Sequence, residues 1–279
     1  MKINWFPGHM TKALRTMHSE VKNIDVVIYM LDSRAPLACL NPEFDKLIIN
    51  KPVLFVLNKA DMADKSKFSL VKENIQKIFK NNFQIIESNS TASGISKMVL
   101  SKLKILSAEK IKKNTAKGLN SFIKAMVIGV PNSGKSTFVN NLCGKGKTLT
   151  GNKPGVTKGK QWVHISSNIQ VLDTPGTLYP DLSDEQTAEY LGYIGSISDN
   201  VLDINELVLI FIEALERQYP NTLKNRYNIE LNGSAIEKIK QIALSKKMLI
   251  KGGEIDYDRT CVMILDDFRK RRLGNITLL

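Results

Sequence analysis

The segment GVPNSGKS, residues 129–136, has the composition and spacing of a phosphate-binding loop. Its glycines allow backbone N–H groups to surround phosphate oxygens, and the dipole of a following helix adds a favourable field. In this pattern Lys135 reaches the β- and γ-phosphates of a nucleotide, and the Ser136 hydroxyl binds Mg²⁺. The other contacts that we expect from this loop are Asn132, Ser133, Gly134 and Thr137.

Two later segments carry groups suited to a γ-phosphate. DTPG (173–176) closes an apolar run, so Asp173 is placed to hold the Mg²⁺ shell and Gly176 can offer its N–H to the phosphate. The loop 152–162 contains Thr157, whose hydroxyl is a further candidate Mg²⁺ ligand. A simple turn or an ordinary loop threonine would be the alternative for each segment taken alone.

The segment NKAD, residues 58–61, has the side chains of a guanine reader. Asp61 can accept from both guanine N–H donors, Asn58 suits the O6/N7 side, and the Lys59 stem can lie over the base. Such paired polar contacts discriminate strongly, because the wrong base leaves buried groups unpaired. ESNSTASG (87–94) offers the guanine O6 three further groups: Ser88, Asn89 and Ser90.

The elements that must position these residues alternate between strands and helices. Helices are expected near 9–23, 67–80 and 94–106, and strands at 25–33, 52–61, 83–90, 123–130, 161–166 and 169–176. This alternation predicts an α/β domain over residues 1–180, with a doubly wound, mostly parallel sheet. From about 184 only amphipathic helical patterns occur, which predicts an all-helical C-terminal domain over 184–279.

The motif order is unusual, because NKAD precedes the phosphate loop by about 70 residues. Most GTP-binding proteins have the reverse order. A parallel sheet with its loops at one edge depends on which strands are adjacent, and joining nearby termini while opening the chain elsewhere preserves the site. The sequence therefore predicts a circular permutation, joined through a Lys-rich connector at 107–121 and opened just after DTPG.

Charge and composition narrow the possible partners. The net charge is +13, and residues 97–160 alone contain 14 lysines, no arginine and one acid, Glu109. This window is either a solvated surface or a surface that faces a polyanion such as nucleic acid. No apolar run approaches the roughly 20 residues that cross a bilayer, and no secretion signal is recognisable. The three isolated cysteines indicate neither a disulfide framework nor a zinc site, so the cytoplasm is expected.

The permuted order resembles that of the circularly permuted GTPases, and specifically the ribosome biogenesis GTPase A family. The segments that carry the resemblance are WFPGHMTKA (5–13), NKAD, GVPNSGKST (129–137), GVT (155–157), DTPG and KGGEIDYDRT (251–260). The resemblance implies a GTPase required for late maturation of the large ribosomal subunit. It further implies GTP or GDP and rRNA as partners, neither membrane nor DNA, and a monomer off the ribosome.

The resemblance also implies two catalytic features. His9 matches the proposed catalytic histidine of the family, with a helix-capping or RNA-facing histidine as the alternative. Asn132 matches the residue that positions K⁺ in potassium-dependent members, so K⁺ is expected beside Mg²⁺. Thr177 stands where many GTPases have a water-orienting Gln, which predicts slow intrinsic hydrolysis that the ribosome stimulates.

Other readings remain open at this point. One is a GTP-dependent RNA-binding switch that acts on another partner, with incidental hydrolysis. A metabolic kinase is a third class, although no acceptor-substrate site is recognisable. Because the DTPG segment runs directly into the predicted helices, loss of a γ-phosphate could reorient the helical domain.

Overall fold

The computed structural model describes residues 6–80, 82–89, 94–144, 161–230 and 232–279. Six strands form one sheet in the order β3-β2-β1-β4-β6-β5, and every neighbouring pair is parallel except β5 with β6. The strands are β1 (Val26–Asp32), β2 (Val53–Asn58), β3 (Phe83–Glu87), β4 (Ile123–Gly129), β5 (Gln161–Ser166) and β6 (Ile169–Asp173). The predicted mostly parallel sheet is confirmed.

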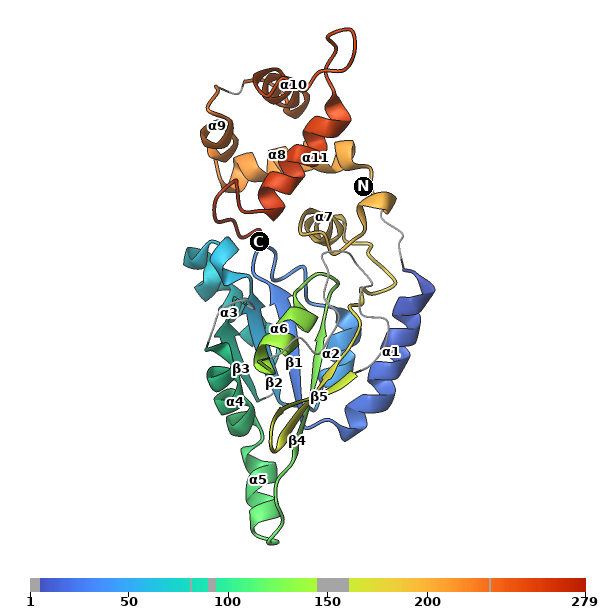
Figure 1. Cartoon of the computed structure of the whole chain (residues 1–279), viewed down its shortest axis with the longest axis vertical. Coiled ribbons are helices and arrows are strands. Elements are labelled where there is room, and N and C mark those ends of the chain that lie inside the picture. Colours follow the sequence, from blue (N-terminus) through green and yellow to red (C-terminus); the bar gives the residue numbers. More distant parts are fainter. Residues whose placement is uncertain (1–5, 81, 90–93, 145–160, 231) are drawn as a thin grey trace.

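Helices cover both faces of the sheet, which explains why β1 and β2 are buried along their whole length. On one face lie α1 (Gly8–Glu20), α2 (Pro42–Ile48) and α3 (Phe68–Ile78). On the other lie α4 (Ile95–Leu106) and α6 (Lys135–Leu142). Short 3₁₀ turns occupy η1 (Val21–Asn23), η2 (Ala60–Met62), η3 (Lys65–Lys67) and η4 (Asp199–Val201). The layers are those of a doubly wound α/β fold (Figure 1).

The Lys-rich connector expected at 107–121 is more regular in the structure than a simple linker. Most of it is a helix, α5 (Ala108–Thr115), which projects from the end of the molecule opposite the C-terminal helices (Figure 1). Lys110 fixes the base of α5, because its Nζ lies 2.7 Å from both Asp25 Oδ2 and the Phe122 carbonyl oxygen. The join is therefore an ordered helical projection.

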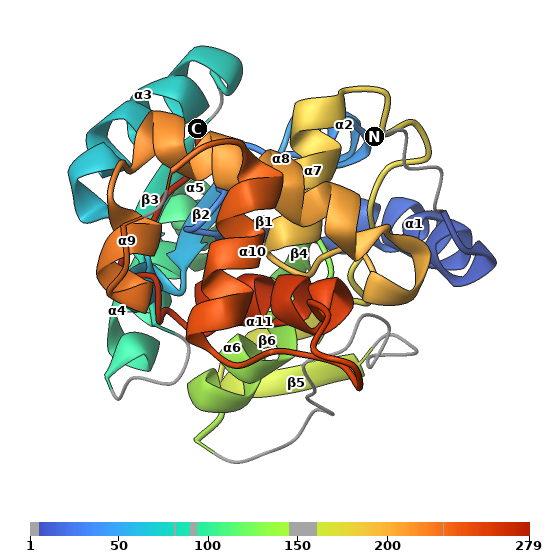
Figure 2. The ribbon, with the colours of Figure 1, turned by 90° about the horizontal axis from the view of Figure 1, so that it is seen from above.

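The chain beyond the sheet forms a helical region (residues 185–279). Its helices are α7 (Glu185–Tyr193), α8 (Ile204–Gln218), α9 (Thr222–Tyr227), α10 (Ala235–Ser245) and α11 (Tyr257–Arg269). An antiparallel bridge between Leu249 and Ile255 joins the loop that precedes α11. The apolar side chains of this region are continuous with the core on the α1 face of the sheet. Figure 2 shows these helices lying over the sheet when the molecule is seen from above.

The final residues tie the helical region to the sheet. The Leu278 N–H donates to the Arg34 carbonyl at 2.7 Å, and the buried Thr277 hydroxyl donates to the Ser33 carbonyl at 3.0 Å. Thr277 Oγ1 also accepts from the Asp64 N–H at 3.0 Å. The C-terminal segment thus packs on the loops that follow β1 and β2.

Candidate functional site

The site lies at the carboxyl edge of the sheet, where four central strands end. The sheet register pairs Asp32 of β1 with Asn58 of β2, and Met30 of β1 with Gly129 of β4. Asp173 of β6 ends beside β4 in the same direction. Loops that follow parallel strands collect at this edge. For this reason motifs about 70 residues apart in the sequence meet in space.

NKAD contacts the phosphate loop directly. The Asn58 side-chain amide donates Nδ2–H to the Ser133 carbonyl at 2.7 Å, and the Lys59 ammonium donates to the Asn132 carbonyl at 2.7 Å. Lys59 has a φ of 57°, so the chain turns sharply after β2. Asp61 follows in η2 and is half-buried. These contacts join the two segments into one site.

The segment after β3 is linked to the same turn. The Ser88 N–H donates to the Leu57 carbonyl at 2.8 Å, and the Ser88 carbonyl accepts from the Ala60 N–H at 3.0 Å. The buried Ser88 hydroxyl oxygen has no hydrogen-bond partner within the described chain. Asn89 follows half-buried, and the predicted Ser90 lies outside the described residues. The first two residues of the predicted triplet are thus beside NKAD.

Glycines shape the phosphate loop. A Cβ on Gly129, whose φ is 151°, would lie 2.6 Å from the Met30 carbonyl oxygen. Gly134 has a φ of 91° and immediately precedes α6, where Thr137 lies half-buried in the first turn. Both conformations favour glycine. The backbone therefore bends tightly from β4 into the N-terminus of α6.

Lys135 is held inside the loop. Its Nζ donates to the Gly129 carbonyl at 3.0 Å and to the Val130 carbonyl at 2.8 Å. Burial lowers the pKa of this ammonium to about 8. An anion entering the loop would find a preplaced, poorly solvated cation.

Ser136 and Asp173 form a pair that fits a magnesium ion. The Ser136 hydroxyl donates to Asp173 Oδ2 at 2.7 Å. The other carboxylate oxygen, Oδ1, is buried and has no hydrogen-bond partner among the described residues. Burial raises the pKa of Asp173, although the Ser136 hydrogen bond and the Lys135 ammonium act in the opposite direction. Hard oxygen donors in this arrangement suit Mg²⁺, while the predicted ligand Thr157 lies outside the described residues.

The DTPG segment packs against the phosphate loop. A Cβ on Gly176 would lie 2.6 Å from Pro131 Cα and 2.9 Å from Lys135 Nζ, so a side chain there would collide with the loop. The next residue, Thr177, is fully buried, and its hydroxyl is unpartnered in the described structure. Thr177 therefore cannot orient a solvent water as an exposed Gln would.

His9 lies on the first turn of α1 and is exposed. Its neighbour Met10 is buried, and the Met10 sulfur accepts from the Leu178 N–H at 3.5 Å. The start of α1 thus packs on the segment that follows DTPG. This contact puts the helix start that carries His9 near the segment that follows Gly176, and no hydrogen bond or ion pair joins His9 to the phosphate loop within the described residues.

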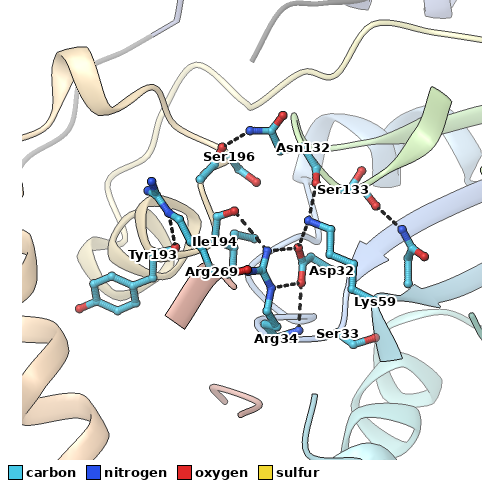
Figure 3. Close-up of polar contacts among 12 residues, drawn as sticks. Asp32, Ser33, Arg34, Lys59, Asn132, Ser133, Tyr193, Ile194, Ser196 and Arg269 are labelled. Carbon is cyan, nitrogen blue, oxygen red and sulfur yellow. Dashed lines mark hydrogen bonds and ion pairs between the residues drawn. The ribbon is translucent and has the colours of Figure 1, made fainter. Parts of the chain in front are cut away.

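One cluster at this edge, Asp32 with Arg34, was not predicted from the sequence. Asp32 accepts from Arg34 Nε at 2.9 Å and Nη2 at 2.6 Å, and from Lys59 Nζ at 2.8 Å (Figure 3). Although burial raises the pKa of Asp32, the two cations lower it well below its usual range. The signal was a charged pair in LDSRAP, directly after an apolar strand. This carboxylate anchors the lysine of NKAD.

No group of three or more His, Cys, Asp or Glu side chains within the described residues could hold a metal ion. None of the described helices is long and apolar enough to cross a membrane.

Comparisons with known proteins agree with this geometry. A family model described as a 50S ribosome-binding GTPase matches residues 124–247, from β4 to just beyond α10. The ribosome biogenesis GTPase A of Bacillus cereus is 39% identical over 99% of this chain and 93% of its own length. That of Bacillus licheniformis is 36% identical over 99% and 98%. The crystal structure of GNP-bound YlqF from T. maritima matches with a TM-score of 0.67 and 25% identity, covering 96% of this chain and 97% of the other.

Proposed function

This chain belongs to the ribosome biogenesis GTPase A family, and from that premise we propose that its GTPase cycle serves late maturation of the large ribosomal subunit. The protein is a GTPase with a role in ribosome biogenesis, and its motif order is circularly permuted. The family model's description as 50S ribosome-binding supports the choice of the large subunit. Cytoplasmic location and a monomeric state off the ribosome belong to the same proposal.

One observation carries the assignment of the nucleotide site. Asn58 and Lys59 of NKAD donate to the carbonyls of Ser133 and Asn132 in the phosphate loop. NKAD and the phosphate loop therefore meet at the carboxyl edge of the sheet, despite their reversed order in the chain. In this site Asp61 would accept from guanine N1–H and N2–H, and the buried Ser88 hydroxyl would serve the O6 side.

The phosphate end of the site would stabilise charge. Lys135 and the backbone N–H groups of Gly134 and Ser136 would hold the β- and γ-phosphates. Ser136 and Asp173 would hold Mg²⁺, which neutralises charge on the phosphate oxygens when bound. Gly176 would offer its N–H to the γ-phosphate.

Hydrolysis would depend on groups other than residue 177. Since Thr177 is buried, we propose that intrinsic hydrolysis is slow and that His9 acts near the attacking water. A His9→Ala variant should hydrolyse GTP more slowly at saturating nucleotide while its GDP affinity stays unchanged. A parallel loss of GDP affinity would instead assign His9 a binding or structural role.

Asn132 is the proposed K⁺ residue. Its backbone is left-handed, with a φ of 57°, and its side-chain Nδ2–H donates to the Gly195 carbonyl at 2.6 Å. A monovalent cation at its amide oxygen would neutralise charge between the β- and γ-phosphates. Hydrolysis by the unaltered protein should be faster in K⁺ than in Na⁺, and the Asn132→Ala variant should lose that difference. Equal rates in the two salts would contradict this part of the proposal.

The ribosomal function is tested by co-sedimentation with immature large subunits. The protein should sediment with these particles when bound to a non-hydrolysable GTP analogue and less when bound to GDP. Added particles should also accelerate GTP hydrolysis. Mature large subunits and small subunits are the matched controls.

A second function, a GTP-dependent RNA-binding switch with incidental hydrolysis, predicts a different result. Nucleotide-dependent binding to a structured RNA would then occur without stimulation of hydrolysis by large-subunit particles. The projecting lysines of α5 are compatible with either RNA partner, so the stimulation assay decides between them.

A further inference from the structure

The two residues that follow Ile194, the C-cap of α7, contact the phosphate loop directly. The Ser196 hydroxyl donates to the Pro131 carbonyl at 2.7 Å, and Asn132 donates its side-chain Nδ2–H to the Gly195 carbonyl at 2.6 Å. Ser196 is fully buried, so water does not compete for its hydrogen bond. Figure 3 shows Asn132 facing this segment. The helical region thus supplies two polar contacts to consecutive residues of the loop.

Pro131 is contacted from another side by the DTPG glycine. A Cβ on Gly176 would lie 2.6 Å from Pro131 Cα and 2.8 Å from Pro131 N. Gly176 is also the residue proposed to meet the γ-phosphate. With atoms this close, any shift of Gly176 toward a phosphate changes its packing on Pro131. Pro131 is therefore a point where the phosphate sensor and the helical region meet.

The segment that carries Ser196 is fixed by two arginines. Arg34 donates Nη2–H to the Ile194 carbonyl at 3.3 Å. Arg269 donates Nε–H to the Tyr193 carbonyl at 2.9 Å and Nη2–H to the Gly192 carbonyl at 2.8 Å. Cations at the C-terminal carbonyls of a helix complement its dipole. These contacts fix the C-terminal end of α7, and with it the position of Ser196 two residues later.

The backbone of this segment also requires a particular residue. Gly195 has a φ of 76°, a conformation that disfavours a side chain. This turn points the Gly195 carbonyl at the Asn132 amide. Asn132 itself has a φ of 57°, which asparagine tolerates better than most residues. Both partners of the hydrogen bond therefore lie in turns that suit their residue types.

We propose that Ser196 and the Gly195 carbonyl are positioning groups for the GTPase reaction, holding the phosphate loop at Pro131 and Asn132 from the helical region. This inference rests on the nucleotide site proposed above. The helical region is joined to the nucleotide site by the chain that runs from DTPG to α7, and the contacts of Ser196 and Gly195 are a second, direct link between them. By linkage, a γ-phosphate that favours one placement of Pro131 also favours one placement of the helical region.

The test compares nucleotide affinities of a Ser196→Ala variant. Losing one buried hydrogen bond at the γ-phosphate side should weaken binding of a non-hydrolysable GTP analogue by about fivefold, with GDP affinity changed by less than about twofold. The turnover rate for GTP should fall by a similar factor. A Ser196→Cys variant keeps the shape of the side chain and a weak donor. Its affinity for the GTP analogue should lie between those of the unaltered protein and Ser196→Ala, and it replaces the alanine variant in the test if that variant is unstable.

A Ser245→Ala variant is the matched control. It removes a hydroxyl of the helical region that donates to the Ile242 carbonyl at 2.8 Å within α10, and it leaves the contacts to Pro131 and Asn132 in place. Both affinities should stay unchanged in this control. Equal losses for GDP and analogue in Ser196→Ala, no loss for either, or the same split in Ser245→Ala would overturn the inference. Failure of the unaltered protein to bind GDP would instead overturn the nucleotide site itself.

Discussion

Asp61 is the residue on which base selection should depend. Its carboxylate can accept from the N1–H and N2–H donors of guanine, whereas an amide would present a donor to the amino group. An Asp61→Asn variant should lose GDP affinity by at least about 100-fold and gain affinity for xanthosine diphosphate, which has a carbonyl at that position. Equilibrium titration with both nucleotides measures this change in base preference.

The control for this substitution lies three residues away. Asp64 caps η3 by accepting from the Ser66 N–H at 3.0 Å, and asparagine is an equally good cap. The Asp64→Asn variant should keep the preference for GDP over xanthosine diphosphate. A preference that is unchanged in Asp61→Asn would remove NKAD from the base-reading role.

Lys135 makes nucleotide affinity depend on pH. Burial lowers its pKa to about 8 in the free protein, and a bound phosphate would raise it. The complex then retains a proton that the free protein loses, so affinity is highest below about pH 8 and falls as pH rises above it. GDP titrations between about pH 7 and pH 9 should show this fall, at no more than roughly tenfold per pH unit.

A Lys135→Arg variant separates this effect from other titrations. Its guanidinium stays charged throughout the range, so its affinity, although weaker, should be nearly constant with pH. A constant GDP affinity in the unaltered protein would show that the ammonium is already fully protonated when the site is empty of phosphate.

Motif chemistry predicted Asn58, Lys59 and Lys135 as site residues. The structure places Asn58 and Lys59 against the phosphate loop that also holds the Lys135 ammonium, and their roles in nucleotide binding stay predictions. The pair of Asp32 with Arg34 was not predicted because neither residue matches a nucleotide motif. Its contact with Lys59 of NKAD depends on the register that places Asp32 beside Asn58. Such cross-strand neighbours are set by tertiary structure, which a single sequence does not reveal.

At the scale of elements, α5 decides where the proposed rRNA contact lies. Lys112, Lys113 and Lys117 are exposed on or just after this projecting helix, whereas Lys110 pairs with Asp25. Replacing the three exposed lysines with Gln should reduce the salt dependence of binding to large-subunit particles. The slope of log K against log salt should fall by roughly 2 to 3, since each of the three phosphate contacts contributes about 0.7 to 0.9.

A second lysine cluster, in the helical region, is the alternative rRNA contact and supplies the matched variant. Lys246, Lys247 and Lys251 are exposed on the loop that follows α10 in the helical region, and replacing them removes the same charge. If the slope falls only for this second set, rRNA contact belongs to the helical region. Figure 1 places the two surfaces at opposite ends of the molecule, so one compact RNA element cannot cover both.

The helices α2 and α5 were not predicted from the sequence, for different reasons. The helix α2 is short, but Asn41 caps it by accepting from the Glu43 N–H, and Pro42 begins it. That N-cap and proline pair is a recognisable start signal. The helix α5 was expected only as a connector because its sequence is rich in lysine and has no clear apolar stripe. In the structure no α5 residue is buried. Long periodic elements such as α8 were predictable, since their buried face is continuous.

At the scale of the whole molecule, the helical region is a structural partner of the nucleotide site. Ser196 contacts the phosphate loop, and Arg34 bridges Asp32 to the carbonyls of Ile194 and Arg269. Thr277 packs under the loop that follows NKAD. The sequence predicted the helices but not these contacts, because side chains that meet across domains leave no periodic signal.

The sheet order has a further consequence for synthesis. The strands β1, β2 and β3 leave the ribosome first and can pair with one another, but β1 also pairs with β4, whose residues follow about 100 positions later. Until β4 emerges, the apolar strand β1 is an open sheet edge, which is prone to pairing with other chains. A protein that helps to build ribosomes therefore exposes its own aggregation-prone edge while a ribosome is making it, until β4 covers that edge.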